Sequence, residues 1–205
     1  MPRSLGSPLI TAGLLLSACA ATTTFTSTWK DPTARPVNPV GKTVAAVFVT
    51  ANEGQRRAAE DVMVSALNRH GARGVAAYTI IPNEGRADNN AANEHLKAAG
   101  ANGVVVMRVV GKDQQLTYTP GGPAPAYYGR FSGYWGYGWG TVSDPGYLRT
   151  DTIISLETLV YSLEQDKLLW AGTSRTTNPD KLDSFINEVA DAAANEMIKQ
   201  GVIVK

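Results

Sequence analysis

Cysteine, histidine and surplus charge are all scarce in this chain of 205 residues. It has one cysteine and two histidines, and its 19 lysines and arginines nearly balance 18 acidic residues, for a net charge of +1. A single cysteine excludes an internal disulfide framework and a thiolate-rich metal site, and we expect no metal and no other cofactor. Proteins that wrap nucleic acid carry a clear basic excess, so we expect no nucleic-acid partner.

Catalytic motifs are missing as well. The chain has no G-x-G-x-x-G and no G-x-S-x-G sequence, and Gly41-Lys42 precedes a strand pattern where a P-loop needs a helix. His70 and His95 lie near the ends of two separate expected helices, and no further metal ligands are spaced to join them. Glu157 lies in an apolar strand pattern without a second carboxylate, so we interpret it as a satisfied or solvent-facing acid. We therefore expect no enzymatic activity.

The N-terminal residues have the pattern of a secretion signal. Arg3 is the only charged residue before Cys19, and an uncharged apolar run at 9–16 is followed by two small residues. A positive start, a short apolar middle and small residues at the cut site define a secretory signal. The run is well below the ~20 apolar residues that span a bilayer, so we interpret residues 1–18 as a cleaved signal peptide.

The sequence Leu16-Ser17-Ala18-Cys19 resembles the lipobox of bacterial lipoproteins. The resemblance implies cleavage before Cys19 and acylation of its thiol and its new amino group, which makes the membrane a partner of this chain. Two or more acyl chains hold a protein stably on a membrane. Ala20 rather than aspartate follows the cysteine, and by analogy with lipoprotein sorting this favours the periplasmic face of the outer membrane.

Residues 19–42, which begin with the lipidated cysteine, have the composition of a flexible tether. They are rich in Thr, Ser, Pro and Ala and show little apolar periodicity. Such a composition does not bury enough surface to order itself. We expect the tether to hold the domain some ~25 Å from the lipid, with Trp29 docked on the domain or at the membrane interface.

Residues 43–205 have the pattern of a single domain of the α/β (α+β) class. Short apolar runs rich in β-branched residues indicate strands at 43–50, 74–81 and 103–110, and an extension of the third strand over 114–118 stays open. One amphipathic helix is expected from the cap residue Asn52 to Gly71, and a shorter one at 91–99. Strands that alternate with helices in this way predict parallel pairing in part of the sheet.

Beyond residue 150 the pattern changes to two extended runs, 152–163 and 167–177, joined by a polar turn. This spacing is typical of a β-hairpin. A final amphipathic helix is expected to start at Asn178 and to end before Gly201. The full order is β-α-β-α-β-loop-β-β-α, a mixed β-sheet with helices packed on it.

A loop rich in glycine and aromatic residues is expected at 120–150. Glycine adds freedom without packing, and long loops without regular structure are usually functional or disordered. Three interpretations stay open: a lid over one sheet face, a surface that docks a partner or a glycan, and contact with the membrane interface. The candidate binding residues are Tyr127, Tyr128, Phe131, Tyr134, Trp135, Tyr137, Trp139 and Tyr147.

Several short motifs carry a further resemblance. Besides the lipobox they are Trp29-Lys30-Asp31-Pro32, Arg57 with Glu60-Asp61, Ala101-Asn102-Gly103-Val104-Val105, Glu157-Thr158-Leu159-Val160-Tyr161 and Leu168-Leu169-Trp170-Ala171-Gly172. Together they resemble an uncharacterised family of bacterial envelope lipoproteins, the domain of unknown function 4136 group or a close relative. The resemblance implies an envelope location and an αβ fold, and it supplies no established activity.

The sequence therefore predicts a non-catalytic, lipid-anchored protein of the cell envelope that docks an envelope protein partner. An outer-membrane lipoprotein facing the periplasm is the form that the signal and the residue after Cys19 favour. The alternative is an envelope protein that binds a ligand or a glycan through the aromatic-glycine loop.

Overall fold

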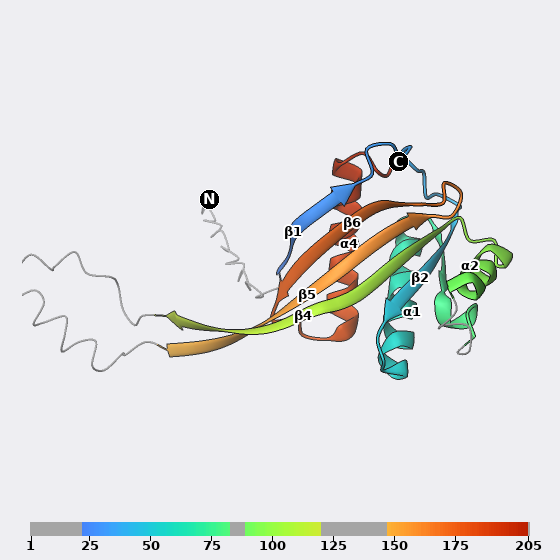
Figure 1. The fold of residues 1–205 in the computed structure, drawn as a ribbon. Coiled ribbons are helices and arrows are strands. Elements are labelled where there is room, and N and C mark those ends of the chain that lie inside the picture. Colours follow the sequence, from blue (N-terminus) through green and yellow to red (C-terminus); the bar gives the residue numbers. More distant parts are fainter. Residues whose placement is uncertain (1–21, 83–88, 120–146, 205) are drawn as a thin grey trace, which may run out of the picture.

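The computed structural model describes residues 22–82, 89–119 and 147–204, which form a mixed sheet with helices packed on it (Figure 1). The fold class expected from the sequence is confirmed. The strands lie in the spatial order β1-β6-β5-β4-β2-β3. Their bounds are β1 Thr22–Lys30, β2 Thr43–Val49, β3 Arg73–Ala76, β4 Gly103–Thr119, β5 Tyr147–Ser162 and β6 Lys167–Thr177. The helices are α1 Glu53–Arg69, α2 Asn89–Ala98 and α4 Leu182–Lys199, with a short 3-10 helix, η1, at Ala77–Thr79.

Parallel and antiparallel pairing divide the sheet. Strand β2 pairs in parallel with both β3 and β4, and each of these connections passes through a helix, as parallel strands require. Strands β4, β5, β6 and β1 then pair antiparallel in turn. The expected hairpin is β5–β6, and its turn places Asp166 at a φ of 51°, a left-handed conformation that aspartate tolerates better than most residues.

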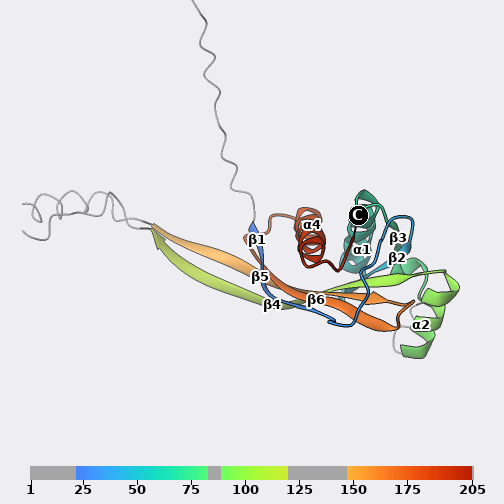
Figure 2. The ribbon, with the colours of Figure 1, turned by 90° about the horizontal axis from the view of Figure 1, so that it is seen from above.

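Helices α1 and α4 lie side by side on one face of the sheet, as the view from above shows (Figure 2). Met63 of α1 and Ile186 of α4 are almost fully buried against Met107 and Leu156 of the sheet. Full burial of a side chain of this size stabilises the fold by about 1.5–3 kcal/mol. This layer is therefore the main core, and it holds both long helices in place.

Helix α2 covers only one end of the opposite face. Leu96 of α2 packs with Ala45 of β2 and Val104 of β4, all three buried. Ala45 and Ala46 follow one another along β2 and belong to the two opposite cores, which is the alternation that a strand imposes. Ile80 and Ile81, which follow η1, pack against the same cluster, as do Val47 of β2 and Val106 of β4.

The ends of the helices follow their sequence signals with one exception. The Asn52 side chain accepts a hydrogen bond from the Gln55 backbone N–H at 3.0 Å, and Gly71 ends the α1 region with a φ of 87°. Helix α4 begins at Leu182 rather than at Asn178. Asn178 instead ends β6, because its side chain accepts a bond from the backbone N–H of Thr152 in β5 at 2.8 Å.

The expected flexible tether is wrong for most of residues 19–42. Residues 22–30 form β1, which pairs with β6 along its length with one irregularity. The ring of Phe25 packs edge-on against Trp170, with ring centroids 5.4 Å apart. The strap that follows, residues 31–42, is also bound, since Val37 forms a bridge with Ile203. Strand β1 lies at the edge of the sheet and, among the described strands, pairs with β6 alone. Its threonines at alternate positions and the packed ring of Phe25 are sufficient to hold it there.

Two other boundaries differ from the sequence prediction. The strand expected at 74–81 is only β3, four residues long, and η1 follows it before Pro82. The strand expected at 103–110 runs on to Thr119 and pairs with β5 from Tyr147 onward. Residues 147–150 of the expected loop are therefore strand.

Candidate functional site

Most of the candidate residues chosen from the sequence lie outside the described part of the chain. This holds for Cys19 and for seven of the aromatic residues, Tyr127, Tyr128, Phe131, Tyr134, Trp135, Tyr137 and Trp139. Tyr147 is described, and it is an exposed residue at the start of β5, opposite Thr119 of β4. The structure directs attention instead to the sheet face that the long helices leave uncovered.

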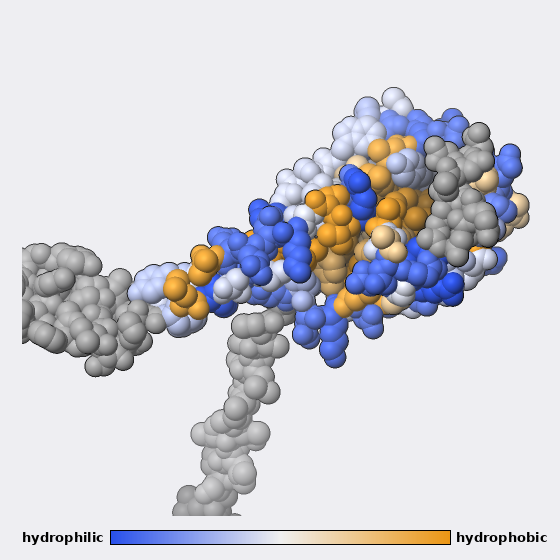
Figure 3. Space-filling view, turned by 60° about the horizontal axis from the view of Figure 1, so that its bottom comes forward, coloured by the Kyte–Doolittle hydropathy of each residue, from blue (hydrophilic) through white to orange (hydrophobic). Residues whose placement is uncertain are grey.

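A row of five apolar residues crosses that face, which we call the open sheet face. Pairing places Trp29 of β1 opposite Ala171 of β6, then Leu159, Val106 and Val47 of the next strands. Trp29 is 49% exposed, and the other four are partly buried. Directly paired residues point to the same side of a sheet, so the five form a continuous apolar stripe. Figure 3 shows hydrophobic side chains gathered on this side of the molecule.

The neighbouring row on the same face carries charge. Arg108 of β4 donates a hydrogen bond to Glu157 of β5 across the strands, with Nη2 and Oε2 2.9 Å apart. The sequence interpretation of Glu157 as a satisfied acid is thereby confirmed. Val49 lies next to Arg108 in this row and is exposed. The open sheet face thus combines an apolar stripe with a fixed ion pair, a mixture that is typical of protein interfaces.

Sequence reasoning missed the open sheet face for a physical reason. Residues 103–107 of β4 are apolar almost without a break, which suggested a strand covered on both sides. The available signal was the pair of charged residues, Arg108 and Glu157. Two charged residues in apolar strands, two positions along from Val106 and Leu159, mark the side that faces solvent.

Strands β4 and β5 continue beyond the sheet as a two-stranded ribbon, which comprises residues 114–119 and 147–152 (Figure 1). A network around Asp151 fastens its base. The Asp151 carboxylate accepts hydrogen bonds from the side chains of Asn178 at 2.6 Å and Thr117 at 3.1 Å, and it pairs with Arg149 at 2.8 Å. The bonds from Asn178 and then Arg149 hold the pKa of Asp151 below its usual value.

A buried acid in the middle of α1 fastens that helix to the sheet. Glu60 is fully buried and accepts hydrogen bonds from two backbone N–H groups, that of Phe48 at 3.2 Å and that of Tyr78 at 2.7 Å. Burial raises the pKa of its carboxyl, while the two backbone bonds and the charge of Arg56 oppose that rise. Each oxygen has a structural partner, so Glu60 joins α1 to β2 and η1.

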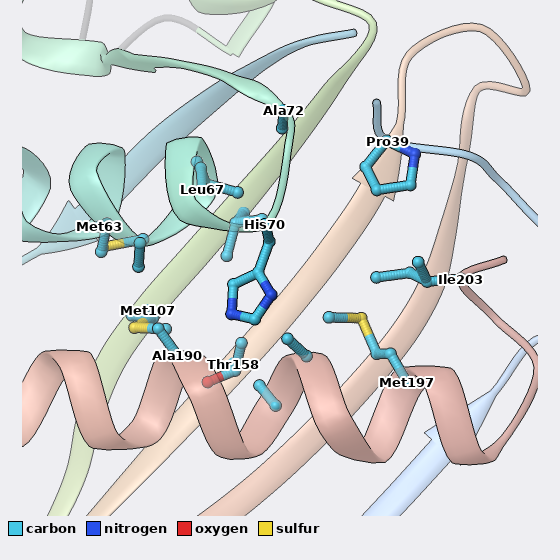
Figure 4. Close-up of a pocket in the computed structure, with 14 residues that line it drawn as sticks. Pro39, Met63, Leu67, His70, Ala72, Met107, Thr158, Ala190, Met197 and Ile203 are labelled. Carbon is cyan, nitrogen blue, oxygen red and sulfur yellow. The ribbon is translucent and has the colours of Figure 1, made fainter. Parts of the chain in front are cut away.

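An apolar cavity lies between α1, α4 and the sheet (Figure 4). It has a volume of ≈ 70 Å³, and Pro39, Leu67 and Met197 also line a neighbouring cleft of ≈ 540 Å³ beneath the strap. The hydroxyl of Thr158 is buried at the cavity without a hydrogen-bond partner among the described residues. His70 at its edge lies 3.0 Å from the Asp191 carboxylate. The cleft has the size of a small-molecule pocket, and its lining is mainly aliphatic.

The described residues bring together neither a metal site nor a membrane span. No three His, Cys, Asp or Glu side chains in residues 22–82, 89–119 and 147–204 are grouped as metal ligands. Within the same residues, no helix combines the length and the apolar character needed to cross a membrane.

Comparison with known proteins gives likenesses of structure alone. No family model matches the chain, and no curated protein matches it. Among solved structures, the PelC dodecamer from Paraburkholderia phytofirmans is similar at 12% identity, with a TM-score of 0.46, over 91% of this chain and 100% of that one. Lipoprotein GNA1162 from Neisseria meningitidis is similar at 12% identity, with a TM-score of 0.41, over 77% of this chain and 99% of that one.

Proposed function

We propose that the chain is a non-catalytic, lipid-anchored protein of the cell envelope that docks a protein partner on its open sheet face. The observation that carries the proposal is the apolar stripe from Trp29 to Val47, which crosses five strands. Exposed contiguous apolar surface beside polar residues marks interaction sites. Trp29 at the β1 end of the stripe and Arg108 in the neighbouring row are residue types that dominate binding energy at interfaces.

The chemistry of the face favours binding over catalysis. Its charged pair, Arg108 and Glu157, is already engaged, and neither side chain faces a nucleophile on the neighbouring row of Val106, Leu159 and Ala171. General acid–base catalysis needs a titrating group within reach of the reacting atom. An Arg–Glu pair next to aliphatic side chains offers specificity for a protein partner.

The proposed anchor is the lipid on Cys19, at the periplasmic face of the outer membrane. The lipobox and the residue Ala20 support it, as the sequence indicates. An anchored domain meets its partner in two dimensions, so a modest interface suffices to keep the pair together. The resemblance to the domain of unknown function 4136 group belongs to this same proposal.

A second candidate function rests on the cleft beneath the strap. Its ≈ 540 Å³ and mainly aliphatic lining fit a small apolar ligand. A glycan is favoured less there, because sugar recognition uses aromatic faces, and Tyr161 is the single aromatic side chain among the described residues that line the cleft. Neither ligand would explain the stripe on the opposite side of the sheet, so partner docking remains the leading proposal.

Site-specific crosslinking in cells tests the partner. A photoreactive amino acid at Val49, which is exposed beside Arg108, is expected to give a discrete protein adduct. The same group at Lys199, exposed on α4, is the matched control and is expected to give none. Trp29→Ser in the Val49 protein removes the large ring from the stripe and is expected to lower the adduct about tenfold or more. Equal adducts from both positions, or none from Val49, would contradict the proposal.

A further inference from the structure

The start of β1 and the base of the ribbon lie on one line across the sheet. Thr22 pairs with Thr177 of β6, Thr177 with Ile153 of β5, and Ile153 with Asp113 of β4. Beyond this line only β4 and β5 continue (Figures 1 and 2). The N-terminal end of the described chain and the ribbon therefore leave the sheet at the same end.

The proposed anchor sits very close to this line. Only Ala20 and Ala21 separate Cys19 from Thr22, and a fully extended chain covers at most ~3.6 Å per residue. An acylated Cys19 thus lies within ~11 Å of the sheet. Residues 114–119 extend past the line by about 20 Å at ~3.4 Å per residue. The ribbon is longer than the tether that starts at the same end of the sheet. It therefore lies close to the membrane surface unless the sheet is oriented with the ribbon pointing away from the bilayer.

The ribbon carries large apolar side chains on one of its sides. Tyr118 pairs directly with Leu148, and Leu116 lies two residues before Tyr118 on the same side. Leu116 is 70% exposed, Leu148 is 68% exposed and Tyr118 is 58% exposed. Hydrophobic side chains are visible along the ribbon in Figure 3. A two-stranded ribbon has no second layer of its own to cover such residues.

The charge of the ribbon is balanced. Its only ionisable acid and base in residues 114–119 and 147–152 are Asp151 and Arg149, and they pair with each other at 2.8 Å. Approach to a lipid surface therefore leaves no isolated charge to desolvate. Leucine partitions into the acyl region, and tyrosine is enriched at the level of the headgroups. The side chains thus match an interfacial lipid layer.

We propose that the ribbon lies on the bilayer that holds the lipid anchor, with Leu116, Tyr118 and Leu148 in the interface between headgroups and acyl chains. This inference rests on the proposed anchor at Cys19. The ribbon and the acyl chains then make two separate contacts with one membrane. Two contacts fix the tilt of the domain, whereas a single tether leaves the domain free to rotate.

Fluorescence depth measurement on the lipidated full-length protein tests the proposal. Acylation consumes the native thiol, so Tyr118→Cys provides one site for an environment-sensitive dye in vesicles of phosphatidylethanolamine and phosphatidylglycerol. The dye is expected to shift to shorter wavelength and to be quenched by lipids that carry a quencher near the headgroup. Val40→Cys is the matched control, because Val40 is 62% exposed in the strap at the other end of the sheet. Its dye is expected to emit as in water.

Paired substitutions separate the ribbon from the anchor. Leu116→Ser with Leu148→Ser, in the Tyr118→Cys protein, is expected to reduce lipid quenching severalfold, while the protein still floats with vesicles. Flotation with vesicles and the mass of the N-terminal peptide report the anchor alone. A protein that does not float and whose N-terminal peptide has the mass of an unacylated one would refute the lipid anchor. Flotation with equal quenching at positions 118 and 40 would overturn the ribbon contact. Shielding of position 118 only when envelope proteins are added would overturn it in favour of a protein partner.

Discussion

At the scale of single residues, two buried threonines differ in whether their hydroxyl groups have a hydrogen-bond partner. Thr158 and Thr176 are both fully buried threonines in neighbouring strands. The hydroxyl of Thr176 shares a hydrogen bond with that of Thr23 at 2.6 Å, whereas the hydroxyl of Thr158 has no partner among the described residues. An unsatisfied buried polar group costs about 1–3 kcal/mol, and a satisfied one contributes about 1 kcal/mol. The two threonines should therefore respond oppositely to the same substitution.

The first prediction compares the two threonines directly. Thr158→Val replaces an unpartnered hydroxyl with a methyl group of similar size and is expected to raise the free energy of unfolding by about 1 kcal/mol. Thr176→Val removes the bond to Thr23 and is expected to lower that free energy by about the same amount. Urea denaturation followed by circular dichroism measures both. A loss of stability in Thr158→Val equal to that of Thr176→Val would show that the hydroxyl of Thr158 is satisfied.

At the scale of elements, the sequence predicts those whose signals are local. Helix α1 is predicted from its Asn52 cap to Gly71, and the β5–β6 hairpin from its polar turn. Strand β1 is missed because it depends on a partner far along the chain, and threonine-rich composition does not reveal that partner. The sequence leaves the extension of β4 over 114–118 open, and it misses the start of β5 at Tyr147, because pairing of the two strands with each other is what orders both.

The same limit applies to the candidate site. Sequence reasoning selected Tyr147 for its aromatic ring, and the structure describes it as an exposed strand residue. It did not select Trp29, Leu159 or Val106 as a set, since only sheet pairing brings them into one row. A site made by register across several strands is invisible to patterns within any one of them.

The second prediction concerns the ribbon as an element. Asp151→Ala removes the acceptor for Asn178, Arg149 and Thr117 at the ribbon base, so the amides of residues 114–119 are expected to exchange with solvent at least about tenfold faster. Hydrogen exchange read by NMR measures this. Asp113→Ala, at an exposed position of β4 two pairs away from Asp151, is the control and should leave the rates unchanged. Unchanged protection in Asp151→Ala would mean that strand pairing alone holds the ribbon.

The charge of the Asp151 carboxylate makes the stability of the ribbon depend on pH. Its pKa is lowered in the fold, first by Asn178 and then by Arg149. The stabilisation is therefore present above the ordinary value of 3.8 and is lost as the pH falls through the lowered pKa. In the intact protein, ribbon protection should weaken in that acidic range, and in Asp151→Ala it should not change there.

At the scale of the whole molecule, the buried acid Glu60, which joins α1, β2 and η1, makes the stability of the fold depend on pH. Burial raises its pKa above the ordinary value of 4.5, so the folded chain holds this proton more tightly than the unfolded chain does. The contribution of Glu60 to the free energy of unfolding is complete below pH 4.5. It declines as the pH rises from there through the raised pKa.

The third prediction uses that decline. The difference in unfolding free energy between the natural protein and Glu60→Gln is expected to shift in favour of the variant as the pH rises above 4.5. Urea unfolding at a series of pH values measures it. Glu164→Gln is a control of opposite sign, because hydrogen bonding to Lys42 lowers the pKa of Glu164. Parallel pH profiles for the natural protein and Glu60→Gln would contradict the assigned direction.

The pairing of the first strand with the last one has a consequence for biogenesis. Thr22 pairs with Thr177, and Lys30 pairs with Trp170, so most of the polypeptide lies between the two partner strands. In a chain that crosses a membrane from its N-terminus, β1 would emerge first and wait for β6 to arrive. Such a long-range closure comes late in folding. Under the lipid anchoring proposed above, β1 would therefore remain unpaired while enzymes act on Cys19, only three residues before Thr22.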